Sequence, residues 1–418
     1  MLREPALNRL ALLSLHSSPL AVIGSADAGG MNVYVRRMAD ELSSMGIHVD
    51  VFTRRTDPRA PEVIRTKDGA RIIHLEGGPR RELPKSVLPL HVRAMAASFR
   101  SFVEREQLCY DVLHTHYWLS GLVALRCRDV VDAPIVHMFH TLSKVKELYN
   151  GGPDPNDSGH RFEGERSVIA GADVVVGATE MEREQMERLY GRAPHSFSVI
   201  PLGVDLDLFR PRDQQECRRI VEISADRLIV FVGRPDRIKG LDTLLFAVGA
   251  LPSQLQRGLK LVVVGDAGSE RAKGGARIRR LVQTLGLANT VEFRGIVSQH
   301  ELAHYYSAAD ICAVPSAYES FGMVAVESMA CQTPVVAFSV GGLAATIRDG
   351  HTGFLVPAGD RAAYAAKLAA ALALPTLVDV GRRARLSVQP YEWSRIVERT
   401  LVLYERVMRR SVLCCGVH

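Results

Sequence analysis

Short apolar runs alternate with longer amphipathic segments along almost the whole chain. Runs of valine, isoleucine and leucine bounded by glycine or proline are typical of strands covered on both faces, and their alternation with helices favours parallel sheets. Because this pattern continues through the chain, we expect two doubly wound α/β domains in tandem. The predicted strands span residues 9–15, 48–53, 71–75, 111–116, 133–139, 173–178 and 197–201, then 228–233, 259–265, 290–294, 311–315 and 334–338.

The length of the chain also favours two domains. A chain of 418 residues is too long for one ordinary hydrophobic core. The boundary is expected between Pro201 and Asp205, where a strand ends before a charged, proline-containing stretch. This predicts domains at 1–203 and 204–390, followed by an amphipathic helix at 391–411 with one apolar side formed by Trp393, Ile396, Val397 and Leu401.

Charge and cysteine usage restrict the class of protein. A formal net charge of +6 favours anionic partners, among them nucleotides, sugar phosphates, nucleic acid and acidic membranes. The seven cysteines show no Cys-x-x-Cys pair with a second pair or histidines at ligand spacing, so neither a disulfide framework nor a zinc site is expected. The first apolar run is short and follows an early proline, which indicates a strand rather than a signal peptide or a spanning helix. We expect a soluble, cytoplasmic protein.

Two adjacent glycines follow the first predicted strand. Gly29 and Gly30 open directly into a helix-like segment. Residues without a side chain allow a backbone to turn sharply or to approach a bulky ligand. Asp27, just before them, is a candidate acid of the site, and it is equally suited to cap the following helix.

In the second half, two cations follow a predicted strand. Arg234 comes directly after Gly233, and Lys239 lies five residues later at the start of the next helix. Ligands of open α/β sheets bind at the carboxyl ends of strands, and two cations beside a helix N-terminus suit a diphosphate. The alternative is a solvated basic turn.

A second motif comes after the strand at 311–315. Glu319 lies in a loop, Ser320-Phe321-Gly322 opens a helix, and Glu327 lies within that helix. Such a segment offers free amides to an anion and carboxylates to hydroxyl groups, which suits a nucleotide sugar. A glutamate pair at this spacing, taken alone, is more typical of surface charge.

Together these motifs resemble the donor site of retaining nucleotide-sugar glycosyltransferases with the GT-B fold. The resemblance implies two Rossmann-like domains with the active site in a cleft between them, and a last helix, 391–418, that completes the first domain. It implies that Arg234 and Lys239 hold the donor diphosphate, Glu327 the ribose and Glu319 the sugar, with retention at the anomeric carbon by a same-face displacement. The donor-binding residues are then Gly30, Arg234, Lys239, Ser320, Phe321, Gly322 and Glu327.

The first domain is similar, more narrowly, to the inositol-phosphate glycosyltransferase family of mycothiol biosynthesis. The matching stretches begin at His16, Gly29, Gly78, His114 and His140. This resemblance implies N-acetylglucosamine as the donor sugar, 1D-myo-inositol 3-phosphate as the acceptor, and an acceptor site made of His16, Gly29, Asn32, Lys85, Tyr117, Thr141 and Arg161. Taken singly, Lys85 and Arg161 are typical of solvated charges; together they predict a phosphate site.

The sequence departs from that family in two loops. It has Ala21-Val22-Ile23 after Ser-Pro, and Asp27-Ala28-Gly29-Gly30 in place of Asp-Ser-Gly-Gly. Because those loops contact the donor sugar and the acceptor, a glucosyltransferase like sucrose-phosphate synthase and a lipid-acceptor mannosyltransferase remain alternatives. A nicotinamide-dependent dehydrogenase is disfavoured because neither glycine-rich loop has the Gly-x-Gly-x-x-Gly spacing. A non-catalytic nucleotide-binding or membrane-docking protein is the remaining alternative.

The predicted catalytic residues are His140, Glu319 and Asp27. His140 is expected near the donor sugar, and a hydrogen-bonded core histidine is the alternative. His114 and His116 are predicted to face opposite sides of one strand, with at least one of them structural. The chemistry needs no cofactor, because the UDP-sugar is a substrate, and Mg²⁺ is left open. The expected partners are the nucleotide sugar, a sugar-phosphate acceptor and a second copy of the chain, with no nucleic acid and no spanning membrane segment.

Overall fold

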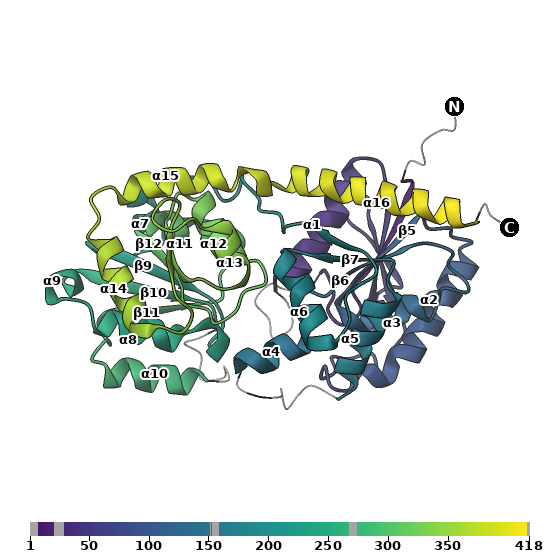
Figure 1. The fold of residues 1–418 in the computed structure, drawn as a ribbon, viewed down its shortest axis with the longest axis horizontal. Coiled ribbons are helices and arrows are strands. Elements are labelled where there is room, and N and C mark those ends of the chain that lie inside the picture. The colour runs from purple at the N-terminus through teal and green to yellow at the C-terminus, as the bar shows by residue number, and fades with distance from the viewer. Residues whose placement is uncertain (1–6, 21–28, 151, 153–158, 267–273, 416–418) are drawn as a thin grey trace. The chain divides into compact units, whose positions relative to one another are not determined.

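The computed structural model describes residues 7–20, 29–150, 152, 159–266 and 274–415 (Figure 1). The chain divides into two units. Unit 1 comprises Met1–Pro201 and Trp393–His418, and unit 2 comprises Leu202–Glu392. The boundaries expected from the sequence lie at 203/204 and 390/391.

Unit 1 is built on a sheet of eight strands with the order β3-β4-β2-β1-β5-β6-β7-β8. Every neighbouring pair is parallel except the edge pair β3 and β4. The strands are β1 Arg9–Leu13, β2 His48–Arg54, β3 Val63–Arg65, β4 Arg71–Leu75, β5 Val112–His116, β6 Ile135–Met138, β7 Val174–Gly177 and β8 Phe197–Val199. The helices are α1 Gly30–Ser44, α2 Val92–Arg105, α3 Tyr117–Leu125, α4 Ser143–Asn150, α5 His160–Gly171, α6 Glu180–Tyr190 and α16 Trp393–Cys415.

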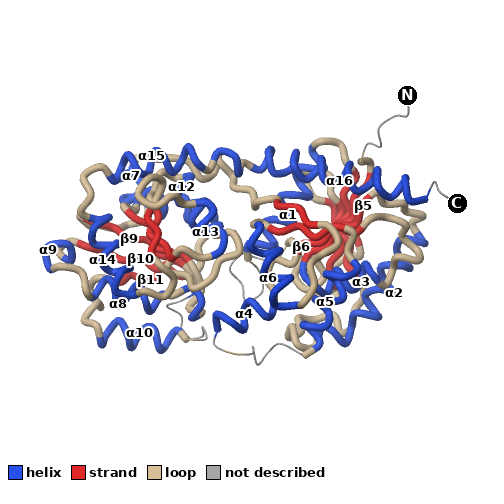
Figure 2. The backbone as a smooth tube through the Cα atoms, in the orientation of Figure 1, coloured by secondary structure: helices blue, strands red, loops and turns tan. Residues whose placement is uncertain are grey.

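Unit 2 is built on a sheet of six parallel strands with the order β11-β10-β9-β12-β13-β14. The strands are β9 Arg227–Val232, β10 Leu259–Val264, β11 Val291–Gly295, β12 Ile311–Val314, β13 Val335–Phe338 and β14 Phe354–Val356. The helices are α7 Gln214–Ile220, α8 Leu241–Gly249, α9 Ser253–Gln256, α10 Gly275–Thr284, α11 Gln299–Ala308, α12 Met323–Ala330, α13 Gly341–Thr346, α14 Arg361–Leu372 and α15 Leu377–Ser387. In each unit the strands lie between helices, as expected for a parallel sheet (Figure 2).

The winding direction reverses once in each sheet. In unit 1 the chain runs outward from β1 through β2 to β4, then returns to place β5 on the other side of β1. In unit 2 the corresponding reversal separates β9 from β12. Since right-handed crossovers place the helices of the two directions on opposite faces, a crevice opens beyond the carboxyl ends of these strands. The loops after β1, β5, β9 and β12 therefore define the expected ligand positions.

The last helix, α16, packs with α1 inside unit 1. It begins at Trp393, two residues after the predicted start. Trp393, Ile396 and Val397 are buried as predicted, whereas Leu401 is only half-buried and the buried stripe continues through Tyr404. Among the described residues no single helix is both long and apolar enough to cross a membrane. Helix α14 and the segment Leu377–Tyr391 reach that length and apolarity only when they are taken together, and they are bent by 105° relative to each other.

The core of unit 1 contains three fully buried histidines, His114, His116 and His137. His114 Nδ1 lies 2.6 Å from the Tyr404 hydroxyl, and His137 Nδ1 lies 2.7 Å from Thr115 Oγ1. The prediction that His114 and His116 face opposite sides was wrong. Residues two apart in a strand share a face, and their ring centroids are 4.3 Å apart.

Burial keeps these three histidines neutral. It lowers the pKa of His114 to about 3 and lowers the pKa values of His116 and His137 well below the ordinary 6.5. The unfolded chain therefore binds more protons than the folded chain once the pH drops below about 6.5. The stability that neutral histidines contribute is complete above that pH and is lost as the pH falls toward 3.

We expect a lower unfolding temperature at pH 5.0 than at pH 7.5, with each buried histidine contributing about 1.4 kcal/mol for each pH unit. Replacing His137 with Gln should make this loss smaller, whereas replacing the exposed His351 with Gln should leave it unchanged. Thermal unfolding of the three proteins at both pH values measures the difference. A His137→Gln variant with the same pH-dependent loss as the unaltered protein would contradict the assignment.

Candidate active site

In unit 2, an ion pair joins the two loops beside the reversal point. The loop after β9 ends in the short turn Arg237–Lys239, and the loop after β12 carries Glu319. Lys239 Nζ donates to Glu319 Oε1 at 2.6 Å, and Ser316 Oγ donates to the same oxygen at 2.9 Å. The structure therefore brings together two of the predicted donor-site residues that are 80 residues apart in the sequence.

Two glycines that the sequence reasoning missed support the Glu319 loop. The Gly342 amide donates to the Glu319 carbonyl oxygen at 2.9 Å. A Cβ atom at Gly341 would collide with that same oxygen, and one at Gly342 would collide with the Phe321 backbone. Adjacent glycines directly after β13 are the sequence signal that could have identified this support.

Arg234 is placed differently from Lys239. Its side chain is 58% exposed and pairs with Asp236 at 3.2 Å. The backbone of its loop is held close to the β12 loop, since Ala317 donates to the Ile238 carbonyl at 2.7 Å. Arg234 is thus a solvent-exposed cation on the same loop as the partly buried Lys239.

The start of α12 offers backbone amides next to the Glu319 loop. Gly322 is the N-cap residue, with φ of 92° and no side-chain cap. Phe321 is buried and packs against Tyr391, so its side chain anchors the helix start, while Ser320 is half-buried. Unsatisfied amides at a helix N-terminus attract anions.

Glu327 lies in α12 and is only 7% exposed. Its Oε2 accepts a hydrogen bond of 2.9 Å from the Tyr306 hydroxyl. Burial raises the pKa of Glu327 to about 7, although the Tyr306 hydrogen bond acts in the opposite direction. A buried carboxylate with room for further donors is suited to bind hydroxyl groups.

In unit 1, the residues after β1 and β5 form an aromatic and cationic cluster. The rings of His16 and Tyr117 have centroids 4.0 Å apart, and Arg161 Cζ lies 5.2 Å from the Tyr117 centroid. The pKa of His16 is lowered well below 6.5, first by burial and then by electrostatic interaction with Lys85, His140, Arg161 and Lys146. The cations of Lys85, Arg161 and Lys146 are therefore close enough to affect one imidazole.

Arg161 is buried, with 5% of its surface exposed. It is therefore not the solvated charge that its sequence position, taken alone, would indicate. Its Nε donates to Glu165 at 2.8 Å, and its Nη2 donates to the Thr141 carbonyl at 3.0 Å and the Thr141 hydroxyl at 3.2 Å. Glu165 also accepts from Ser143 and from the Tyr190 hydroxyl. Sequence reasoning missed Glu165, although its four-residue spacing from Arg161 on a helix is a usable signal.

Tyr117 and His140 have left-handed backbones, with φ of 68° and 59°. This conformation is costly for large side chains and is concentrated at functional sites. His140 Nε2 and His116 Nδ1 lie 3.1 Å apart and share a hydrogen bond, and burial lowers the pKa of His140 to about 3. His140 is therefore neutral near pH 7, with one ring nitrogen held by the core.

Asn32 orders the loops at the start of α1. Its Nδ2 donates to Ser17 Oγ and to the Ser18 carbonyl, both at 2.7 Å, and its Oδ1 accepts from the Gly29 amide at 3.1 Å. The side chain is 2% exposed, so these contacts make Asn32 a support of the glycine loop. Gly30 begins α1, and Asp27 lies outside the described residues.

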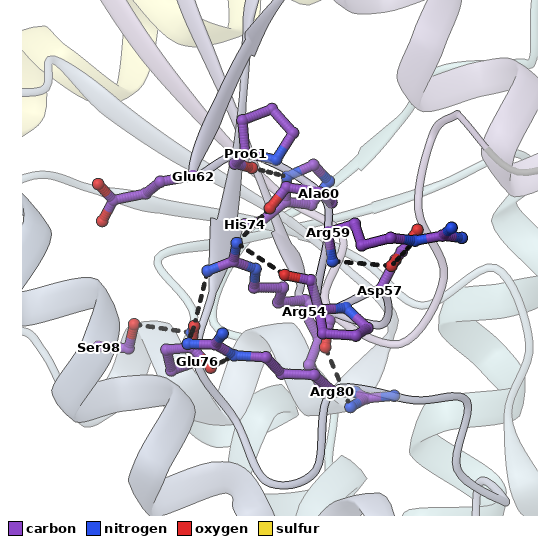
Figure 3. A network of polar contacts seen from close by, with 12 residues as sticks. Arg54, Asp57, Arg59, Ala60, Pro61, Glu62, His74, Glu76, Arg80 and Ser98 are labelled. Carbon is purple, nitrogen blue, oxygen red and sulfur yellow. Dashed lines mark hydrogen bonds and ion pairs between the residues drawn. The ribbon is translucent and has the colours of Figure 1, made fainter.

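Lys85 follows a loop whose backbone carbonyls accept hydrogen bonds from Arg54. Arg54, at the end of β2, is 4% exposed and donates to the carbonyls of Pro79 at 2.9 Å and Arg81 at 2.7 Å. Figure 3 shows the surrounding polar network, in which Glu76 also binds Arg80 and Ser98. This arrangement fixes the segment that leads to Lys85, and no sequence motif had singled out Arg54.

Within the ranges that the structure describes, no group of three or more histidine, cysteine, aspartate or glutamate residues is arranged to hold a metal ion. The candidate residues form one set in each unit, the unit 1 half-site and the unit 2 half-site. The unit 2 half-site offers cations, amides and carboxylates, and the unit 1 half-site offers cations and aromatic rings.

Comparison with known proteins identifies the family. Residues 213–389 match the family described as glycosyl transferases group 1, and residues 28–208 match glycosyltransferase family 4. The D-inositol 3-phosphate glycosyltransferase of Acidothermus cellulolyticus is 40% identical over 407 residues, which cover 95% of this chain and 90% of that protein. The D-inositol 3-phosphate glycosyltransferase 2 of Catenulispora acidiphila is 39% identical over 422 residues, covering 98% of each.

Among solved structures, the sucrose-phosphate synthase of Thermosynechococcus elongatus superposes with a TM-score of 0.86 and 35% identity, covering 96% of this chain and 100% of that one. These similarities extend over both units and agree with two parallel α/β sheets of the GT-B fold. The chain is therefore a glycosyltransferase and belongs to the family that combines a family 4 domain with a group 1 domain.

Proposed function

We propose that this enzyme transfers N-acetylglucosamine from a UDP-sugar to 1D-myo-inositol 3-phosphate, with retention at the anomeric carbon, as in mycothiol biosynthesis. The observation that carries the proposal is the contact of the Tyr117 ring with both His16 and the buried Arg161 in unit 1, with Lys85 and Lys146 near enough to lower the pKa of His16. The names of the relatives from Acidothermus and Catenulispora support the same acceptor.

The unit 1 cluster has the chemistry of a phosphate site. Arg161 is positioned by Glu165 and Thr141, and its guanidinium stacks on Tyr117. Arginine and lysine bind phosphate through charge-assisted hydrogen bonds. Because His16 is neutral, it can orient an acceptor hydroxyl without adding charge. We assign the inositol phosphate to Lys85 and Arg161.

The glycine loop at the start of α1 supports a close approach of substrate. Gly29 has an extended backbone, and a Cβ atom at either Gly29 or Gly30 would meet none of the described protein atoms within 4 Å. Packing among the described residues therefore does not require glycine at these positions. We assign this backbone to the donor pyrophosphate and the acceptor.

The unit 2 half-site is assigned to the UDP-sugar. Lys239 and the exposed Arg234 stabilise the charge that grows on the leaving diphosphate, together with the α12 amides. Glu327 accepts hydrogen bonds from the ribose hydroxyls, and Glu319 binds the sugar. With Nε2 engaged by His116, the Nδ1 atom of His140 is available to a sugar hydroxyl.

The step itself is a same-face displacement. The bond between the anomeric carbon and the diphosphate oxygen breaks, its electron pair stays on UDP, and the acceptor oxygen bonds to the same face of the sugar. The leaving phosphate takes the proton of the acceptor hydroxyl. A sucrose-phosphate synthase-like reaction is the second candidate, because the Thermosynechococcus enzyme superposes over nearly the whole chain.

Replacing Lys239 with Ala should lower kcat/KM by about 100-fold, because losing one electrostatic donor to a developing charge costs about 3 kcal/mol. The matched control is Lys260→Ala, which removes a lysine paired with Glu292 on β10 and β11. UDP release at fixed acceptor concentration measures both variants. Near-normal turnover of Lys239→Ala, with an unchanged unfolding temperature, would reject the role of Lys239.

UDP affinity should rise between pH 6 and pH 8. The ribose hydroxyls bind best to the charged form of Glu327, whose pKa is about 7, so protonation at pH 6 should weaken binding by up to about ten-fold. Calorimetric titration of UDP into the unaltered protein and Glu327→Gln tests this. Both proteins bind the same UDP, so the ionisation of UDP itself cancels when their affinities are compared. If the affinity of both proteins changed with pH in the same way, Glu327 would not be a ligand of the ribose.

Replacing Lys85 with Met should raise the acceptor KM by about ten-fold or more and leave the donor KM within about two-fold, because a charge-assisted hydrogen bond contributes about 1.5–3 kcal/mol. The control is Lys67→Met, an exposed lysine of unit 1. Kinetics with inositol 3-phosphate, inositol and fructose 6-phosphate identify the acceptor. Equal use of phosphorylated and plain inositol would refute the phosphate site, and a preference for fructose 6-phosphate would favour the second candidate.

A further inference from the structure

Unit 2 contains a cationic cavity that the proposed reaction does not use. Its volume is about 410 Å³, and it lies against the starts of α8, α10 and α14. Three arginines line it: Arg237, Arg277 and Arg361. Lys239, Glu319 and Glu327 are not among its lining residues, so it is separate from the assigned donor contacts.

The charges in this cavity are unbalanced. Among the described lining residues, Asp242 is the one carboxylate, and it lies 3.4 Å from Arg277. Arg361 stacks over the exposed ring of Phe246, with Cζ 5.8 Å from the ring centroid. Because arginine does not lose its proton near neutral pH, the described lining residues carry a net charge of +2, from three arginines and one aspartate.

Backbone donors lie at the same place. The N-cap of α8 is Gly240, in a left-handed conformation with φ of 70°, and no side chain caps this end of the nine-residue helix. A larger residue is excluded there, since a Cβ atom would collide with the Pro315 carbonyl oxygen. Gly240 and Thr243 both line the cavity, so the first amides of α8 and a hydroxyl group are available beside the three guanidinium groups.

The other described lining residues are apolar and include Pro315, Ala317 and Phe338, of which Pro315 and Phe338 are buried. A site with cations on one side and apolar surface on the other suits a small organic molecule that carries a phosphate. We propose that this cavity binds the phosphate group of a small phosphorylated metabolite through Arg237, Arg361 and the α8 N-terminus, with Arg277 held in place by Asp242.

This site shares a structural element with the donor half-site. Arg237 and Lys239 are the two ends of the same three-residue turn, and the Ile238 carbonyl between them accepts from the Ala317 amide at 2.7 Å. A ligand that holds Arg237 therefore also restrains the turn that carries Lys239. The binding itself does not depend on the reaction proposed above.

The test is calorimetric titration of glycerol 3-phosphate and, separately, inorganic phosphate into the full chain saturated with UDP, at matched ionic strength. UDP occupies the donor site, and the Lys85→Met background removes the assigned acceptor phosphate contact. We expect binding that persists in Lys85→Met and weakens at least about ten-fold in Arg237→Gln/Arg361→Gln. The control Arg280→Gln, which removes an exposed arginine of α10 that does not line the cavity, should bind normally.

Tighter binding of glycerol 3-phosphate than of phosphate assigns the site to an organic phosphate, and equal binding assigns it to free phosphate. The single variant Arg361→Gln, with an unchanged unfolding temperature, should reproduce part of the loss if the double variant folds poorly. Absence of binding, or binding lost in Lys85→Met and retained in the arginine variants, would overturn the proposal. In that last case the acceptor assignment stands and only the second site fails.

Discussion

The salt bridge between Lys239 and Glu319 joins the two loops on which the unit 2 half-site depends. It exists because the chain leaves β9 in one direction and reaches β12 only after its winding has reversed, so residues 80 positions apart meet beyond adjacent strand ends. Gly341 and Gly342 then hold the Glu319 loop from the β13 side. Unit 1 repeats the arrangement, with His16 after β1 and Tyr117 after β5. Both half-sites thus follow from one property of doubly wound sheets.

Burial divides the polar residues of unit 1 into neutral and charged groups. The histidines, which can lose their proton at low cost, become neutral when they are desolvated. Arg161 cannot do so, and it is buried only together with Glu165. Removing one partner of such a pair leaves an uncompensated charge and costs about 3–5 kcal/mol. The positive charge of the unit 1 half-site therefore depends on lysine and arginine, and the histidines supply shape and hydrogen bonds.

The sequence predicts most of the strands because apolar and β-branched residues dominate them and turn residues often follow. It misses β3 and β14, which have three residues each and no apolar run long enough to recognise. Motif residues in loops after strands were identified, including Lys239 and Glu319, but their contact depends on the strand order and cannot be read from spacing. Arg54 and Glu165 were missed for a related reason, since each acts through backbone carbonyls or a buried partner that only the folded chain brings near. The prediction that His114 and His116 face opposite sides was wrong because residues two apart in a strand lie on the same face, which the sequence spacing already shows.

Helix α16 makes unit 1 discontinuous in the chain, because its core includes Tyr404, whose hydroxyl lies 2.6 Å from His114, and Trp393, whose ring packs against Tyr34. During synthesis on a ribosome, domains generally fold as their residues emerge, starting from the N-terminus. Unit 2 is encoded without interruption and can fold as soon as Glu392 has emerged. Unit 1 is translated first, but the residues that pack against Trp393 and Tyr404 lack these partners until the last helix is made. The core of unit 1 is thus completed only after the whole of unit 2 has been translated.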